Sequence, residues 1–151
     1  MNTSAIETDV LVEDVVGEPA DAVALRLRQA TEAVERARRR REPTALTRAL
    51  VVLARVYLRL GHYAEAQALA DEILAQAPPR SPDRADAWQV LANCAVELES
   101  PAQAEAYYRT AAELARELGY HRAQVAALHG LAAGVYFLRG RFDLALAADA
   151  E

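Results

Sequence analysis

The sequence contains no lysine and few residues of several other types. Its 151 residues include one Cys, one Trp, six Gly and six Pro, and aromatic residues make up only 6%. A single Cys cannot close a disulfide within the chain, which excludes a disulfide scaffold. Aromatic residues, and β-branched residues other than Val, are too scarce for an all-β sandwich or barrel. The same scarcity disfavours an α/β sheet.

Long apolar segments and targeting signals are also lacking. No stretch approaches 18 uncharged apolar residues, so we expect no transmembrane helix and no membrane partner. The N-terminus has neither the basic region nor the apolar core of a signal peptide. Together with the single Cys94, which agrees with a reducing compartment, these absences predict a cytoplasmic protein.

Positive charge is scarce at one end of the chain and concentrated next to it. The net charge is -5, which predicts no general attraction to nucleic acid. Residues 1–21 contain six acids and no base, whereas residues 26–48 contain eight Arg and three acids. We interpret residues 1–18 as an acidic, disordered tail, although their valines leave a short strand or docking against the body as alternatives.

Helix-forming residues dominate what is present. The chain has 35 Ala and 19 Leu, which lead the helix propensity scale. Apolar residues three and four apart predict a leading helix over residues 19–42, and Pro43 ends it. Six more helical segments follow, with Ser81 as a predicted N-cap. They span residues 44–60, 63–77, 82–98, 101–118, 121–139 and 141–151. Since the links are two to five residues long, these helices should pack as antiparallel hairpins.

The hairpins repeat a pattern of small and aromatic residues. The first unit contains Leu53-Ala54-x-x-Tyr57 and Gly61-x-Tyr63-x-x-Ala66. The second unit contains Trp88-x-x-Leu91-Ala92 and Ala104-x-x-x-Tyr108. The third unit contains Ala133-x-x-Tyr136 and Gly140-x-Phe142-x-x-Ala145. The equivalent residues Ala66, Ala104 and Ala145 lie 38 and 41 positions apart. Small residues let two helices approach closely, and large ones fill the space between hairpins. We place the units at residues 44–80, 82–120 and 121–151, the last one incomplete.

This pattern resembles the tetratricopeptide repeat family. The resemblance implies an all-α, right-handed superhelix, an α-solenoid of stacked antiparallel helix hairpins with about seven helices. The second unit departs from the family pattern at Ala95, where an aromatic is expected, and at Glu99, which replaces the turn glycine. The third has His129 at the tryptophan position. Long units rich in Ala, Leu and Arg look like the repeats of bacterial signalling proteins and transcription regulators.

The resemblance implies a binding groove lined by the first helix of each hairpin. The predicted partner-binding residues are Arg48, Arg55, Arg59, Gln89, Asn93 and Phe137, and Val51, Leu58, Asp86 and Glu97 are expected on the same faces. Arg can pair with a carboxylate through two hydrogen bonds, and amides can hold a peptide backbone. The predicted function is therefore a protein or peptide interaction module. The alternative is that these side chains are solvated or cross-link neighbouring hairpins.

Two other functions are left open by the sequence. The C-terminal helix is apolar and lacks a polar cap, which suggests the front part of a longer protein or a homodimer formed through this end. The run Arg38–Arg41 is an alternative contact for nucleic acid, though its place in the last turn of a helix also favours cations through the helix dipole.

Candidate chemistry is sparse. His62, His121 and His129 are scattered without partners at ligand spacing, so no metal site is predicted. Cys94 is interpreted as a buried, inert thiol because no base lies near it in the pattern. We predict neither a cofactor site nor a catalytic site, and hence no enzyme.

Overall fold

The computed structural model describes residues 19–137 and 140–150, and the predicted acidic tail lies outside them. The described residues form seven α-helices and one π-helical segment, with no strand among them. Their bounds are α2 (Ala20–Arg40), α3 (Pro43–Arg59), α4 (Tyr63–Gln76), α5 (Pro82–Glu97), α6 (Pro101–Glu117), α7 (His121–Leu131), η1 (Ala132–Phe137) and α8 (Phe142–Asp149). None of these helices is both long and apolar enough to cross a bilayer. The predicted all-α architecture of about seven helices is confirmed.

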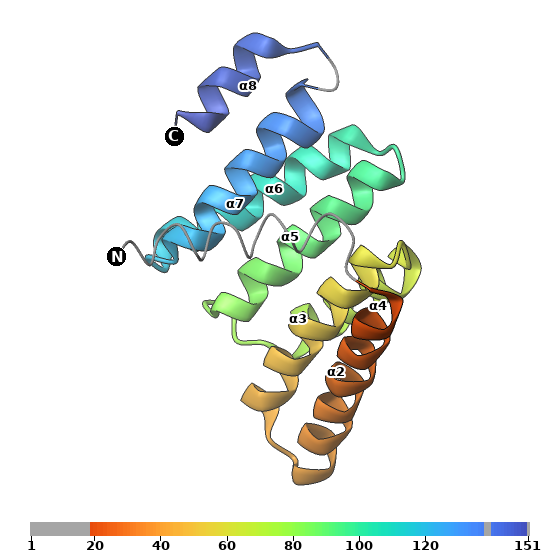
Figure 1. Cartoon of the computed structure of the whole chain (residues 1–151). Coiled ribbons are helices and arrows are strands. Elements are labelled where there is room, and N and C mark those ends of the chain that lie inside the picture. The colour runs from red at the N-terminus through yellow and green to blue at the C-terminus, as the bar shows by residue number, and fades with distance from the viewer. Residues whose placement is uncertain (1–18, 138–139, 151) are drawn as a thin grey trace, which may run out of the picture.

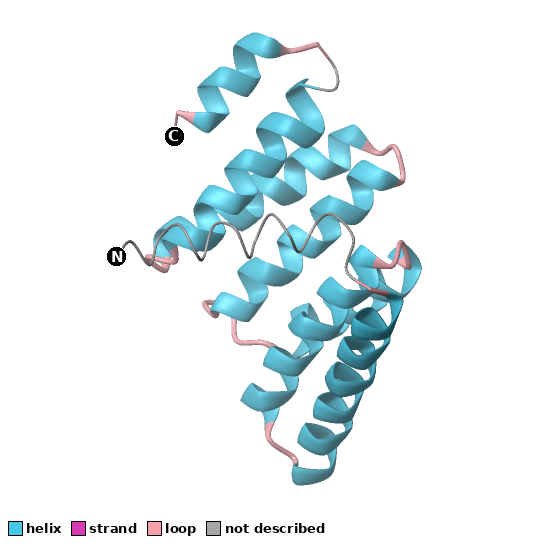
Figure 2. Ribbon diagram, in the orientation of Figure 1, coloured by secondary structure: helices cyan, strands magenta, loops and turns pink. Residues whose placement is uncertain are grey.

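The helices stack in chain order along one direction. Each helix packs against the next, and α3 and α5, which open successive hairpins, also contact each other. Figure 1 shows α2, α3 and α4 at one end and α8 at the other, and Figure 2 shows short loops between successive helices from α2 to α7. Contacts only between near neighbours in sequence are the mark of a helical solenoid.

Proline and glycine set the limits of the helices. Pro43, Pro82 and Pro101 occupy the first turns of α3, α5 and α6, where a missing N–H has no cost. Gly61 follows α3 with φ +74°, a left-handed conformation that glycine adopts freely. Glu99 takes φ +56° at the corresponding turn after α5. The substitution noticed in the sequence therefore leaves the turn intact but places a side chain in a conformation that L residues disfavour.

The start of α5 departs from the prediction for Ser81. Ser81 stands at the N-cap position, but its hydroxyl makes no cap hydrogen bond and is buried without a partner. Pro82 directly follows and supplies no N–H. The position was predicted correctly and the capping role was wrong.

The repeated alanines form the contacts between helices. Ala54, Ala66, Ala92 and Ala104 are fully buried, as their places in the repeat predict. One core cluster joins α2 to α5 and a second joins α5 to α8. Trp88 on α5 packs against both clusters, so the core is continuous along the stack.

The predicted helix over residues 121–139 is not one regular α-helix. Its α-helical part ends at Leu131, and η1 continues it with the wider π geometry. Gly130 and Gly134 weaken the α-helical preference here. Gly130 lies against the ring of Tyr108, where a Cβ would come within 2.4 Å of Tyr108 Cε1, and Gly134 lies against Val96, where a Cβ would come within 3.2 Å of Val96 Cγ2. The apolar spacing in the sequence predicted a helix here but did not predict this local change from α to π geometry.

Candidate functional site

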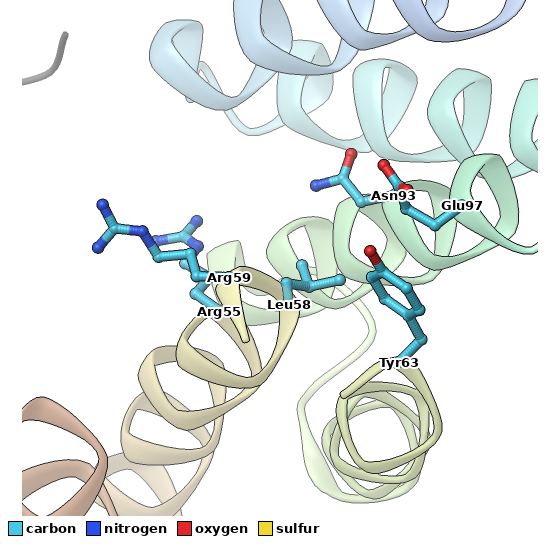
Figure 3. A pocket seen from close by; sticks show the side chains of 6 residues that line it. All are labelled: Arg55, Leu58, Arg59, Tyr63, Asn93 and Glu97. Carbon is cyan, nitrogen blue, oxygen red and sulfur yellow. The ribbon is translucent and has the colours of Figure 1, made fainter. Parts of the chain in front are cut away.

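A cleft lies between the first helices of the first two hairpins. It encloses about 440 Å³. Six side chains line it: Arg55, Leu58 and Arg59 from α3, Tyr63 from α4, and Asn93 and Glu97 from α5. Figure 3 shows the two arginines on one side of Leu58 and Asn93 with Glu97 on the other. The structure therefore brings together three of the predicted groove residues, Arg55, Arg59 and Asn93.

Asn93 is held in place by a buried tyrosine. The Tyr108 hydroxyl donates a hydrogen bond of 2.5 Å to Asn93 Oδ1. Burial, with Glu97 nearby, raises the pKa of Tyr108 to about 12, so the hydroxyl keeps its proton at neutral pH and remains a donor. In Figure 3 the amide nitrogen of Asn93 faces the cleft. The cleft thus presents an oriented N–H₂ group.

A phenol and a carboxylate form the opposite wall. Glu97 lies beside the phenol of Tyr63, and desolvation, followed by the charge of Glu97, raises the pKa of Tyr63. Glu97 is exposed and Tyr63 half-buried. Because Arg55 and Arg59 stand across from them, the cleft has a cationic side and an anionic side.

Two of the predicted arginines join neighbouring hairpins. Arg55 Nη2 lies 2.7 Å from Asp86 Oδ1, and Arg48 Nε lies 3.1 Å from Asp83 Oδ1 without the alignment of a hydrogen bond. Thr47 also donates to Asp83 at 2.8 Å. Burial raises the pKa of Asp86, and the charge of Arg55 partly offsets this. These arginines hold α3 against α5, the cross-linking role left open by the sequence.

The other predicted groove residues lie outside the cleft. Gln89 is half-buried on α5, and Phe137 is 59% exposed on η1, and neither lines the cleft. The expectation that Val51 and Asp86 face the groove is wrong, since both are buried. A helix in the stack is covered by several neighbours, so its buried arc is wider than a single apolar stripe predicts.

One cleft residue was not recognised as a site residue from the sequence. Tyr63 belongs to the second helix of its hairpin, whereas the groove was assigned to first helices only. It stands two residues after the turn glycine Gly61. That fixed position places it at the end of the hairpin, beside the α3–α5 cleft.

The arginine run lies at the C-terminal end of α2. Arg38, Arg39 and Arg40 occupy the last turn, where the helix dipole favours cations. Arg38 pairs with Glu72 of α4 at 2.6 Å, and Arg39 lies 3.9 Å from Glu35. At least half of the run therefore has a structural partner, while nucleic-acid binding stays a prediction.

The thiol and the imidazoles show no reactive arrangement. Cys94 is fully buried, as predicted, and burial raises its pKa to about 11, so almost no thiolate forms at neutral pH. His62 stacks on Tyr57 with 5.8 Å between ring centroids, and His129 lies 3.7 Å from Asp149. Within residues 19–137 and 140–150, no group of three His, Cys, Asp or Glu side chains could hold a metal ion.

Comparison with known proteins identifies two of the repeats. The family model described as tetratricopeptide repeat matches residues 47–78 and 85–118. These matches cover the α3–α4 and α5–α6 hairpins and begin 38 residues apart, which is the spacing of Ala66 and Ala104. No curated protein matches the chain.

Proposed function

The chain belongs to the tetratricopeptide repeat family, whose repeats generally mediate protein–protein interactions, and from this premise we propose that its α3–α5 cleft binds an extended acidic peptide of a partner protein. The module itself carries out no catalysis. Its proposed setting is the cytoplasm, as the sensor or scaffold part of a larger bacterial signalling protein. The long units rich in Ala, Leu and Arg support that setting.

The observation that carries this proposal is the oriented amide beside two guanidinium groups. Asn93, fixed by Tyr108, can donate to the carbonyl oxygen of an extended peptide. Arg59 and Arg55 lie where an acidic side chain or a terminal carboxylate would be paired. Leu58 between them offers an apolar contact. Glu97 on the far wall disfavours an acid there, which would fix the direction of the peptide.

A displayed library of random peptides tests the charge preference. We expect peptides selected on the full chain to be enriched in Asp and Glu. Arg59→Glu should shift the selection toward Lys and Arg, because it reverses the charge of the cationic wall. Arg116→Glu on the exposed face of α6 is the matched control and should leave the preference unchanged. An unchanged preference in Arg59→Glu would contradict the proposal.

The amide is tested with the best selected peptide. Asn93→Ala should weaken its binding about tenfold, the loss of one or two oriented hydrogen bonds. Gln89→Ala, on the same helix but outside the cleft, should bind as the parent does. Circular dichroism must show the same helix content for both variants. Equal affinity of Asn93→Ala and the parent would remove the amide from the site.

Self-association is a second candidate because of the apolar residues near α8. The three most exposed large apolar side chains of the described residues are Leu146, Phe137 and Val125, in α8, η1 and α7. Such residues, gathered in neighbouring elements, are typical of interfaces. Light scattering over a concentration series should then show a dimer that Leu146→Glu disrupts. A monomer at every concentration would contradict this candidate.

A further inference from the structure

The amide that Asn93 presents to the α3–α5 cleft is oriented by a residue outside that cleft. The lining residues come from α3, α4 and α5, whereas the hydrogen bond to Asn93 Oδ1 comes from Tyr108 of α6. Tyr108 is only 3% exposed, and a buried hydroxyl needs a partner. Whatever holds Tyr108 in place therefore also determines which end of the amide faces the cleft.

The third hairpin, formed by α7, η1 and α8, provides the space in which the Tyr108 side chain lies. A Cβ on Gly130 of α7 would lie 2.4 Å from Tyr108 Cε1 and 3.0 Å from the hydroxyl oxygen. A Cβ on Gly134 of η1 would lie 3.7 Å from the same oxygen. The ring thus occupies the place of a side chain at position 130, and its hydroxyl lies between the third hairpin and Asn93.

The π segment η1 is fixed to α6 on both sides of Tyr108. The Tyr136 hydroxyl donates to Glu105 Oε1 at 2.8 Å and accepts from Arg109 Nη2 at 2.5 Å. Glu105 and Arg109 stand three residues before and one residue after Tyr108, which places all three on one side of α6. The segment η1 also packs against α5, so it contacts both helices that the hydrogen bond between Tyr108 and Asn93 joins.

The first repeat shows that stacking of hairpins does not need this arrangement. At the repeat spacing of 38 residues, the equivalent of Tyr108 is Ala70 of α4, which is fully buried. At the spacing of 41 residues, the equivalent of Gly130 is Gln89 of α5, which is half-buried. A tyrosine against a glycine is therefore not required to join two hairpins. What distinguishes the second repeat is a hydroxyl that reaches Asn93.

We propose that Tyr108 is a positioning residue of the α3–α5 cleft, and that the third hairpin holds it there through Gly130 and Gly134. The inference rests on the proposed peptide site and deepens it, because none of the described residues of the third hairpin lines the cleft. While the phenol donates to Oδ1, the amide turns its N–H₂ group to the cleft and selects a hydrogen-bond acceptor. Without the phenol the amide is free to turn over, and this preference is lost.

The mobility of the Asn93 side chain tests the proposal without any peptide. The full chain contains two asparagines, Asn2 and Asn93, so labelling with ¹⁵N-asparagine gives two side-chain N–H₂ signals, and Asn93→Ala identifies one of them. We expect the heteronuclear NOE of the Asn93 amide to be high in the parent and clearly lower in Tyr108→Phe. Tyr107→Phe, the same change at the neighbouring residue, is the matched control. An Asn93 amide as rigid in Tyr108→Phe as in the parent would overturn the proposal.

The role of the third hairpin is tested in the same way. Gly130→Ala should also lower the NOE of Asn93, because the added methyl group displaces the Tyr108 ring. Gly134→Ala has milder contacts and should lower the NOE less, and it serves alone if Gly130→Ala does not fold. Ile73→Val, which removes a buried methyl group from the first core cluster, controls for lost stability. A parent-like NOE in both glycine variants, or an equal loss in Ile73→Val, would contradict the role of the third hairpin.

Binding of the peptide selected for the cleft connects positioning with recognition. Tyr108→Phe should weaken this binding about threefold to tenfold, and it should have no further effect in an Asn93→Ala background. A full additional loss in that background would show that Tyr108 does not act through Asn93 and would overturn the proposal. If no peptide binds the parent while Asn93 still loosens in Tyr108→Phe, the proposed function fails and the positioning of the amide stands.

Discussion

The two junctions between successive hairpins use different chemistry in the same helical frame. Between the first and second hairpins, Arg48 and Arg55 of α3 pair with the buried Asp83 and Asp86 of α5. Between the second and third, the Tyr108 ring of α6 fits against Gly130 of α7. The first junction depends on buried ion pairs, whereas the second combines this close ring contact with a half-exposed network in which Tyr136 of η1 donates to Glu105 and accepts from Arg109 of α6.

This difference predicts different sensitivities. A buried carboxylate needs its partner, so the first junction should respond to pH and to the loss of one charge. A ring packed against a glycine has no room for a methyl group, so the Tyr108–Gly130 contact of the second junction should respond to side-chain volume and not to pH. One repeat frame therefore accepts either solution, provided that each junction excludes water.

The largest expected effect is at the second junction. Gly130→Ala puts a Cβ within 2.4 Å of Tyr108 Cε1 and should lower the free energy of unfolding by about 2 kcal/mol, since the ring cannot shift cheaply. Urea unfolding measures this. Gly134→Ala, whose Cβ would meet Val96 Cγ2 at 3.2 Å, is the milder control. Without a clash Gly130→Ala would be stabilising, because Ala is the better helix former.

The second largest effect is expected when the ion pair of the first junction is removed. Arg55→Ala leaves Asp86, only 3% exposed, without its ion pair and should cost about 1–2 kcal/mol in urea unfolding. Arg48→Ala should cost less, because Asp83 keeps its hydrogen bond from Thr47. In an Asp86→Asn background the cost of Arg55→Ala should shrink. An unchanged cost there would show that the two side chains do not act as a pair.

A smaller effect concerns the turn between the two junctions. Glu99→Gly should stabilise the chain by about 0.5–1 kcal/mol, because glycine relieves the left-handed strain at φ +56° but loses more entropy on folding. Thermal unfolding should show a higher midpoint. Glu99→Ala keeps the positive φ and should show no such gain. A lower midpoint for Glu99→Gly would mean that the Glu99 side chain makes a stabilising contact.

The smallest expected effect is a pH dependence of stability that arises from Asp86 at the first junction. Burial raises the pKa of Asp86 above its ordinary value of 3.8, so the folded state holds this proton more tightly than the unfolded state. The contribution of Asp86 to stability is therefore fully present at a pH below the pKa of Asp86 in the unfolded state. It is lost as the pH rises through the pKa of Asp86 in the folded state. In urea unfolding, the free energy of unfolding of Asp86→Asn should rise relative to that of the parent as the pH is raised from 4 toward neutrality. The loss in free energy of unfolding caused by Gly130→Ala should stay the same over that pH range.

The sequence predicted the frame of the fold because short-range rules produce it. The alanine period located the hairpins, and Pro82 and Gly61 located helix ends, since these act within one turn of helix. The ion pair between Arg55 and Asp86 depends on the register of two helices 31 residues apart in sequence, which no local pattern contains. The same holds for Tyr63, and for the π segment that follows Leu131, where packing against Tyr108 matters.

Cys94 gives the first junction a built-in reporter. It is the single cysteine of the chain and is buried on α5, with its thiol against the backbone of α4. A thiol reagent can reach it only when those helices separate. The rate of labelling in native buffer would therefore time the opening of this one joint, and a comparison with the global unfolding rate would show whether the stack parts there first.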